Sequence, residues 1–260
     1  MNAERPDMST DQAWEEWGRR DPYFGVITDP RYRRSGMTDE LKREFFQSGA
    51  NHVRSLFETI RRYLDANFEP KNILDFGCGV GRLLVPFAAA AERVVGLDVS
   101  PAMLLEAKRN CEERQLHNVA LMASDDVLST LTETFDLIHS YIVFQHIPVQ
   151  RGRTLFVELL KHLRPGGVGA IHLTYSKSSY ASTHGLGPSP DRSPVPLDTL
   201  RPTSEDPEMQ MNPYNINELL FSMQRLGFTR THIEFTDHGG ELGAFLFFSL
   251  DGSHIGSTGF

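Results

Sequence analysis

Short apolar runs alternate with segments of helical periodicity through the middle of the chain. The runs at 71–76, 93–98, 118–122, 135–139 and 168–175 are expected to form strands, because each is short and rich in apolar residues. The first is almost continuously apolar, which is typical of a central strand that a parallel sheet buries on both faces. The alternation of strands and helices predicts an α/β fold.

Apolar residues at helical spacing occupy the N-terminal part of the chain. Residues 9–20 are expected to form a helix capped by Ser9 or Thr10. Residues 38–68 are expected to form one or two amphipathic helices, with Gly49 as the candidate break between them.

Three later helices are expected from helix-breaking proline and glycine residues as well as from the periodicity of apolar residues. The helix after the first strand should start near Val80 and bend, or become regular, near Pro86. Residues 153–163 form an amphipathic segment that ends at a Pro-Gly-Gly sequence, and 215–226 end at Gly227.

The C-terminal part contains two more expected strands, at 228–235 and 244–250, which are joined across 237–240. Before them, residues 176–213 are rich in Pro, Ser, Thr, Gly and Asp and lack apolar periodicity. Because a loop of this length is usually functional or disordered, we expect a lid or a substrate-selecting insertion here, with disorder as the alternative.

The stretch 73–82 joins the first strand to a turn that contains Gly77, Gly79 and Gly81. Glycine tolerates positive φ and lets the backbone approach a ligand closely. A strand, a glycine turn and a helix N-terminus together form a ligand cradle at the carboxyl end of a parallel sheet. A dinucleotide fingerprint would need its third glycine at position 82, where this chain has Arg82, so a pyrophosphate is not the expected ligand.

Asp98 ends the second strand and is the candidate ribose ligand. A carboxylate suits vicinal hydroxyls because it offers acceptors only. The alternative is that Asp98 caps the following helix. Ser100 already supplies that cap and Pro101 the first helical position, so we expect Asp98 to be free to meet a ligand.

These features, with others that follow in order, resemble the class I S-adenosylmethionine-dependent methyltransferases. The first motif is the sequence DFGCGVG at 75–81, and the resemblance is good over about 70–175 and moderate in the last quarter. It implies a Rossmann-like seven-stranded methyltransferase sheet, mostly parallel, with an antiparallel C-terminal hairpin and helices on both faces. It also implies an N-terminal helical cap at 1–69 and a methyltransferase domain at 70–260 that binds S-adenosyl-L-methionine.

The resemblance also implies the cofactor contacts. Val99 and Met103 would sandwich the adenine ring, Asp125 would accept a hydrogen bond from its amine, and Asp126 would cap the next short helix. The full expected set is Asp75, Gly77, Cys78, Gly79, Gly81, Asp98, Val99, Met103, Asp125, Asp126 and Ser140.

The sequence gives weaker signals for the residues that would contact the molecule that accepts the methyl group. The fourth strand continues into an aromatic-Gln-His sequence, which resembles the family's fourth motif, and His146 and Tyr141 are the catalytic candidates. Histidine is the natural base near neutral pH, but His146 is equally consistent with a packed residue that pins its loop. Further candidates for acceptor contacts are His139, His172, Tyr175 and Tyr214.

The composition of the chain limits the classes of binding partner that we expect. The 260 residues carry a formal net charge of −8, which argues against a general nucleic-acid surface. The sequence contains no apolar run long enough to span a bilayer and no apolar signal-peptide core, so we expect a cytoplasmic protein that does not contact membranes. The two cysteines, Cys78 and Cys111, lack metal-ligand spacing, and no metal is expected. The oligomeric state is open, with a homodimer as one candidate.

The expected activity is methyl transfer from S-adenosylmethionine to an oxygen or nitrogen of a small molecule. The first alternative is an enzyme that uses this cofactor without moving the methyl group, by cyclisation or aminocarboxypropyl chemistry. The second is a non-catalytic cofactor-binding partner protein. A nicotinamide dehydrogenase is disfavoured by Arg82 and the terminal hairpin.

Overall fold

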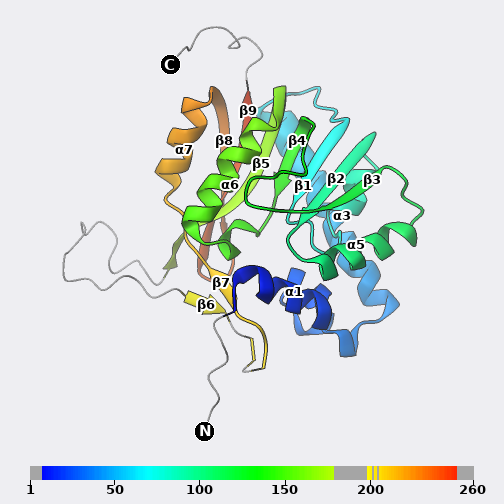
Figure 1. Ribbon diagram of the computed structural model, residues 1–260. Coiled ribbons are helices and arrows are strands. Elements are labelled where there is room, and N and C mark those ends of the chain that lie inside the picture. Colours follow the sequence, from blue (N-terminus) through cyan, green and yellow to red (C-terminus); the bar gives the residue numbers. More distant parts are fainter. Residues whose placement is uncertain (1–7, 179–197, 201, 204, 251–260) are drawn as a thin grey trace, which may run out of the picture.

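The computed structural model describes residues 8–178, 198–200, 202–203 and 205–250. In this part of the chain, seven strands form one sheet in the order β3-β2-β1-β4-β5-β9-β8 (Figure 1). Strands β1 to β5 pair in parallel, and β9 runs antiparallel to both β5 and β8. This confirms the predicted methyltransferase-type sheet. The strands are β1 (Asn72–Phe76), β2 (Arg93–Asp98), β3 (Val119–Ala123), β4 (Phe135–Ser140), β5 (Leu163–Lys177), β8 (Phe228–Asp237) and β9 (Glu241–Leu250).

Helices cover both faces of the sheet. On one face α3 (Asp39–Tyr63), α4 (Leu84–Ala88) and α5 (Pro101–Glu112) bury side chains against Ile73 of β1. On the other, α6 (Val149–Lys161) and α7 (Ile216–Arg225) pack on a core that contains Leu74. Consecutive residues of β1 therefore enter opposite cores, which is why this strand is apolar throughout.

The N-terminal segment folds across one end of the sheet. Helix α1 (Thr10–Arg20) starts at a capping box in which Ser9 accepts from the backbone of Gln12 and the Gln12 side chain accepts from Ser9. A short helix α2 (Pro22–Val26) follows. Figure 1 shows α1 beside the hairpin of β6 (Asp198–Leu200) and β7 (Met209–Met211). Between α2 and α3 lie two 3-10 turns, η1 (Pro30–Tyr32) and η2 (Arg34–Gly36).

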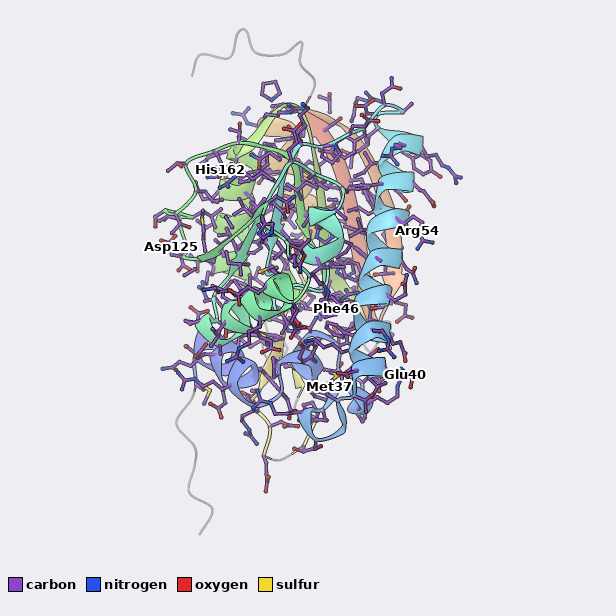
Figure 2. All side chains as sticks on the ribbon, turned by 90° about the vertical axis from the view of Figure 1, so that its right-hand side faces the viewer. Met37, Glu40, Phe46, Arg54, Asp125 and His162 are labelled. Carbon is purple, nitrogen blue, oxygen red and sulfur yellow. The ribbon has the colours of Figure 1, made fainter. Side chains whose placement is uncertain are left out.

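At two helices the structure decides between alternatives that the sequence left open. Helix α3 is continuous through Gly49, and Figure 2 shows it unbroken, with Arg54 directed outward. A Cβ at Gly49 would lie 2.1 Å from the carbonyl oxygen of Arg82. The glycine therefore allows α3 to pass close to the backbone at Arg82, and it does not break the helix. Helix α4 is only five residues long and begins at Leu84, which places Pro86 in its first turn, where proline is tolerated without a kink.

The expected insertion at 176–213 lies mostly outside the described residues. Its described parts are the end of β5, the β6–β7 hairpin and the approach to α7. None of the described helices has the length and apolar character needed to cross a bilayer.

Candidate active site

The glycine turn follows β1 directly and has a left-handed backbone. Gly77, Gly79 and Gly81 have φ values of +73°, +52° and +87°. A Cβ at Gly77 would lie 2.4 Å from a methyl carbon of Val143, and one at Gly79 would lie 2.8 Å from Val26. The backbone therefore forms a concave wall that only glycine can line at these points.

Asp98 holds this turn in place. Its Oδ2 accepts from the backbone N–H of Gly79 at 2.8 Å and its Oδ1 from that of Ser100 at 2.9 Å. As expected, Ser100 caps α5 by accepting from Met103, and Asp98 lines the cavity. A carboxylate has about four acceptor sites, so these backbone bonds do not exhaust its capacity to accept from a ligand. Burial raises the pKa of Asp98 to about 6, against the opposing effect of its backbone hydrogen bonds.

The structure separates the two acidic residues after β3 from the cavity. Asp125 accepts from the backbone N–H groups of Val127 and Ser129 and caps its own turn, the role that the sequence suggested for Asp126. Asp126 instead pairs with Arg151 at 2.6 Å. Figure 2 shows Asp125 on the outer surface, and neither carboxylate lines the cavity. The residue that reaches the cavity from this loop is Ser124.

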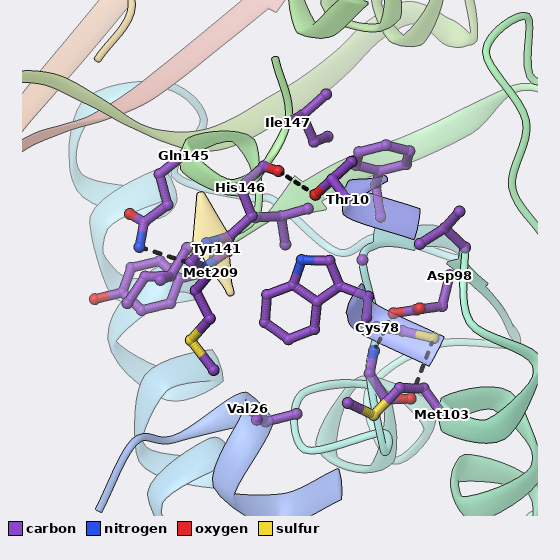
Figure 3. A pocket seen from close by; sticks show the side chains of 18 of the residues that line it. Thr10, Val26, Cys78, Asp98, Met103, Tyr141, Gln145, His146, Ile147 and Met209 are labelled. Atoms are coloured by element: carbon purple, nitrogen blue, oxygen red, sulfur yellow. Dashed lines mark hydrogen bonds between the residues drawn. The ribbon is translucent and has the colours of Figure 1, made fainter. Parts of the chain in front are cut away.

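Most of the remaining candidate residues line one cavity of about 690 Å³. Figure 3 shows Asp98 and Met103 on one side of it and Tyr141, Gln145 and His146 on the other. The expected site residues that line it are Asp75, Gly77, Cys78, Gly79, Asp98, Val99, Met103, Tyr141 and His146. Ser140 and Gly81 do not; Ser140 is fully buried, and its hydroxyl has no hydrogen-bond partner among the described residues.

His146 lies in the 3-10 turn η3 (Phe144–His146) and is 8% exposed. Its Nδ1 lies 2.8 Å from the carbonyl oxygen of Gln210, so that nitrogen carries the proton and donates it. Burial lowers the pKa of His146 to about 4, so the ring is neutral at pH 7. Its backbone carbonyl accepts from Thr10 of α1 (Figure 3). The ring is therefore both pinned and part of the cavity wall.

A second histidine group lies beneath the cavity. His139 Nδ1 is 2.9 Å from Asp75 Oδ1, and its Nε2 is 3.1 Å from His52 Nε2. This chain orients Asp75, whose other oxygen has no partner among the described residues and belongs to the cavity wall. His139 and His172 are buried behind the wall and do not line it.

The two tyrosine candidates also lie away from the cavity. Tyr175 packs against Phe235, and the Tyr214 hydroxyl donates toward the carbonyl groups of Phe144 and Ile147 beneath η3. Tyr214 therefore supports the turn that carries His146 and is not at the cavity mouth.

Several wall residues were not singled out as site residues by sequence reasoning. Met209 and Met211 belong to β7, His238 to the β8–β9 turn, Glu241 to the start of β9, and Arg82 to the end of the glycine turn. Periodicity carries no signal for them, because they are brought together only by the topology of the sheet.

The buried histidines allow a prediction of how the free energy of unfolding changes with pH. Burial lowers the pKa of His52, His172 and His146 to about 2, 3 and 4. Below about pH 6.5 the unfolded chain binds three protons there that the folded chain does not, whereas Asp98 binds one proton in the folded state only. Near pH 5 the difference is about two protons, so the free energy of unfolding should fall as the pH falls from 6.5 to 4.5.

Urea unfolding at several pH values measures that proton difference directly. His52→Phe should reduce it by about one proton, whereas His117→Gln, on an exposed position, should leave it unchanged. A free energy of unfolding that is flat or that rises on acidification would contradict the prediction.

Comparison with known proteins supports the predicted family. Residues 73–167 match a family model described as a methyltransferase domain. A ubiquinone biosynthesis O-methyltransferase of Methylocella silvestris is 34% identical over 108 residues, which are 41% of this chain and 41% of that protein. A trans-aconitate 2-methyltransferase of an Azoarcus species is 40% identical over 104 residues, 39% of this chain and 38% of that protein. An uncharacterized RNA methyltransferase of Geobacter sulfurreducens is 28% identical over 101 residues, 36% of this chain and 20% of that protein. The matches thus span less than half the length of these curated relatives.

Solved structures share the fold over most of the chain. Magnesium protoporphyrin IX methyltransferase from Synechocystis, with bound S-adenosylhomocysteine, has a TM-score of 0.59 and 18% identity and covers 89% of this chain and 98% of its own. The N-methyltransferase NodS from Bradyrhizobium japonicum, in complex with S-adenosylhomocysteine, has a TM-score of 0.55 and 16% identity and covers 93% of this chain and 98% of its own. The fold that the resemblance implied is therefore confirmed.

Proposed function

We propose that this chain, which carries a class I methyltransferase domain, binds S-adenosylmethionine and transfers its methyl group to an oxygen or nitrogen of a small molecule. The observation that carries the proposal is one cavity that is lined by the glycine turn and Asp98 on one side and by Tyr141 and His146 on the other. A nucleoside cradle and a set of acceptor-side polar groups thereby face the same cavity.

The residues fit the cofactor. Asp98 lines the cavity and has acceptor capacity left for the ribose hydroxyls, and Val99 and Met103 offer apolar surfaces for the adenine. The unpartnered oxygen of Asp75 suits the ammonium group of the methionine end. When bound, S-adenosylmethionine supplies a methyl group that its sulfonium has already activated, so the protein mainly has to align donor and acceptor and exclude water.

On the acceptor side, the chain offers hydrogen bonds rather than a strong base. Burial raises the pKa of Tyr141, so its hydroxyl stays protonated and donates. His146 is neutral, with Nδ1–H held by the carbonyl group of Gln210, so Nε2 is an acceptor. The side-chain amide of Gln145 lies 3.4 Å from this nitrogen, a long hydrogen bond that a substrate would have to displace in order to donate a hydrogen bond or a proton there.

We also propose the domain division that the resemblance implied, with 1–69 as a helical cap. It is supported by the cavity wall, to which Thr10, Trp14, Val26 and Ser48 contribute from four places in this segment. Met209 and Met211 line the same cavity, which supports a substrate-selecting role for the end of the 176–213 insertion. A small molecule fits this enclosed arrangement and the net charge of −8 better than a nucleic acid does.

Isotope labelling tests the proposal. The protein is incubated with methyl-¹³C S-adenosylmethionine and a panel of carboxylic acids, phenols and amines, and the products are analysed by mass spectrometry. We expect S-adenosylhomocysteine together with one labelled small molecule. The Asp98→Ala variant is the matched control and should form neither.

Other results would select the alternatives. Accumulation of methylthioadenosine would indicate transfer or cyclisation of the aminocarboxypropyl arm. Labelled nucleosides from a digested RNA sample would indicate an RNA substrate. Tight binding of S-adenosylhomocysteine without turnover on any acceptor would favour a non-catalytic binding partner.

A further inference from the structure

Arg82 points to an unassigned subsite of the cavity. It follows the glycine turn and lines the cavity beside Ser48 of α3. No carboxylate lies within ion-pair distance of it in the described residues. Its one hydrogen bond there is from Nη1 to Ser48 Oγ at 3.3 Å, and its Nε is buried without a partner.

A guanidinium group has five N–H donors, so most of those of Arg82 are unused. Burial lowers the pKa of Arg82, which means that the surroundings disfavour its charge. A buried charge is stabilised when it is paired and hydrogen-bonded, and breaking such a pair is strongly destabilising. An anion in the cavity would supply the missing partner.

The neighbouring charges limit the kind of anion. Asp75 and Glu241 both line the cavity, and each has one carboxylate oxygen without a hydrogen-bond partner in the described residues. Glu241 also pairs with Lys177 at 3.2 Å. Two carboxylates in the wall would repel a doubly charged phosphate more strongly than a singly charged group. The planar fork of a guanidinium matches a carboxylate in shape as well as in charge.

We propose that Arg82, supported by Ser48, is a carboxylate-binding residue of the cavity. The inference rests on the proposed function, and the carboxylate has two candidate sources. It belongs either to the methionine end of the cofactor, with Asp75 facing the ammonium group of the same amino acid, or to the methyl acceptor. Both sources require the same chemistry at Arg82 and differ in which ligand loses affinity when the guanidinium is removed.

Calorimetry with two nucleosides separates these sources. S-adenosylhomocysteine carries the amino-acid end, whereas 5′-methylthioadenosine keeps the nucleoside thioether and lacks it. The variants are Arg82→Gln, Arg82→Lys and, as a charge-matched control, Arg54→Gln on the exposed face of α3 (Figure 2). Removing an unpaired buried charge should raise the melting temperature of Arg82→Gln without ligand, so loss of folding is not expected to obscure the result.

If the cofactor supplies the carboxylate, Arg82→Gln should bind S-adenosylhomocysteine about 10- to 100-fold more weakly and 5′-methylthioadenosine equally well, because hydrogen bonds to charged groups contribute about 1.5–3 kcal/mol. Arg82→Lys should recover part of the affinity, since it keeps the charge but not the fork. Arg54→Gln should change the affinity for neither nucleoside.

If the acceptor supplies it, both nucleosides should bind Arg82→Gln normally. Acetate, benzoate or succinate should then raise the melting temperature of the S-adenosylhomocysteine-saturated wild type and not that of Arg82→Gln. The proposal is overturned if the variant loses affinity for both nucleosides equally, or if neither the nucleosides nor the carboxylates distinguish it from the wild type. Failure of the wild type to bind either nucleoside would instead overturn the proposed function.

Discussion

Replacing Asp98 by alanine should lower the affinity for S-adenosylhomocysteine by at least about 100-fold. The carboxylate is expected to accept two ribose hydrogen bonds, each worth about 1.5–3 kcal/mol with a charged acceptor. It also holds the glycine turn through the backbone N–H of Gly79, so its loss should loosen the cradle as well. Calorimetry on protein shown to be folded by circular dichroism measures the effect.

Asp125→Ala is the informative comparison. The structure places Asp125 on the surface, where it caps its own turn, so this variant should bind S-adenosylhomocysteine like the wild type. An equal loss in both variants would restore the sequence-based assignment of Asp125 to the adenine. Wild-type affinity in Asp98→Ala would remove the basis of the proposed function.

The same carboxylate predicts a pH dependence of binding. Because burial raises the pKa of Asp98 to about 6, the group is partly protonated just below neutrality. The ribose needs the charged form, so affinity should decrease as the pH falls below 6.

Gly77→Ala should strongly destabilise the fold and abolish cofactor binding. Position 77 has φ +73°, and the added Cβ would lie 2.4 Å from Val143. Left-handed strain of about 1–2 kcal/mol adds to overpacking of about 1–3 kcal/mol, so the free energy of unfolding should fall by about 2–5 kcal/mol. Cofactor binding should be lost with it, because the turn and Val143 both form the cavity wall. Urea unfolding and calorimetry are the two measurements.

Gly166→Ala measures the cost of a left-handed backbone without any steric overlap of the added methyl group. Gly166 has φ +76°, but a Cβ there would meet nothing within 4 Å, so only the strain of about 1–2 kcal/mol should appear. Adding Val143→Ala to Gly77→Ala should recover part of the lost stability by making room. Equal losses at both glycines, with no recovery in the double variant, would show that the contact with Val143 is unimportant.

The parts of the fold that were predictable from sequence are those in which local pattern and global position agree. Residues 93–98 were delimited correctly because an apolar run ends there at a polar loop, and α1 begins at its capping box. The role of Gly49 stayed open in the sequence because a glycine inside a helix signals either a break or a close crossing, and only the position of Arg82 decides between them.

The candidate site was predictable where it is continuous in sequence. The glycine turn and Asp98 lie in adjacent strands, and their ends must meet at one edge of a parallel sheet. The assignment of Asp125 and Asp126 failed because two equivalent carboxylates stand side by side, and the sequence does not say which one faces the turn. The roles of Arg82 and Glu241 depend on which partners they lack, which is a property of packing alone.

Helix α1 is bonded to both sides of the cavity that it helps to line. Near its start, Thr10 donates to the carbonyl group of His146, and Asp11 pairs with Arg151. One turn further on, Glu15 accepts from the hydroxyl of Ser100 and from the backbone N–H of Ala102 at the start of α5. The same helix therefore ties the turn that carries His146 to the segment that follows Asp98, so a displacement of α1 would alter both sides of the cavity together.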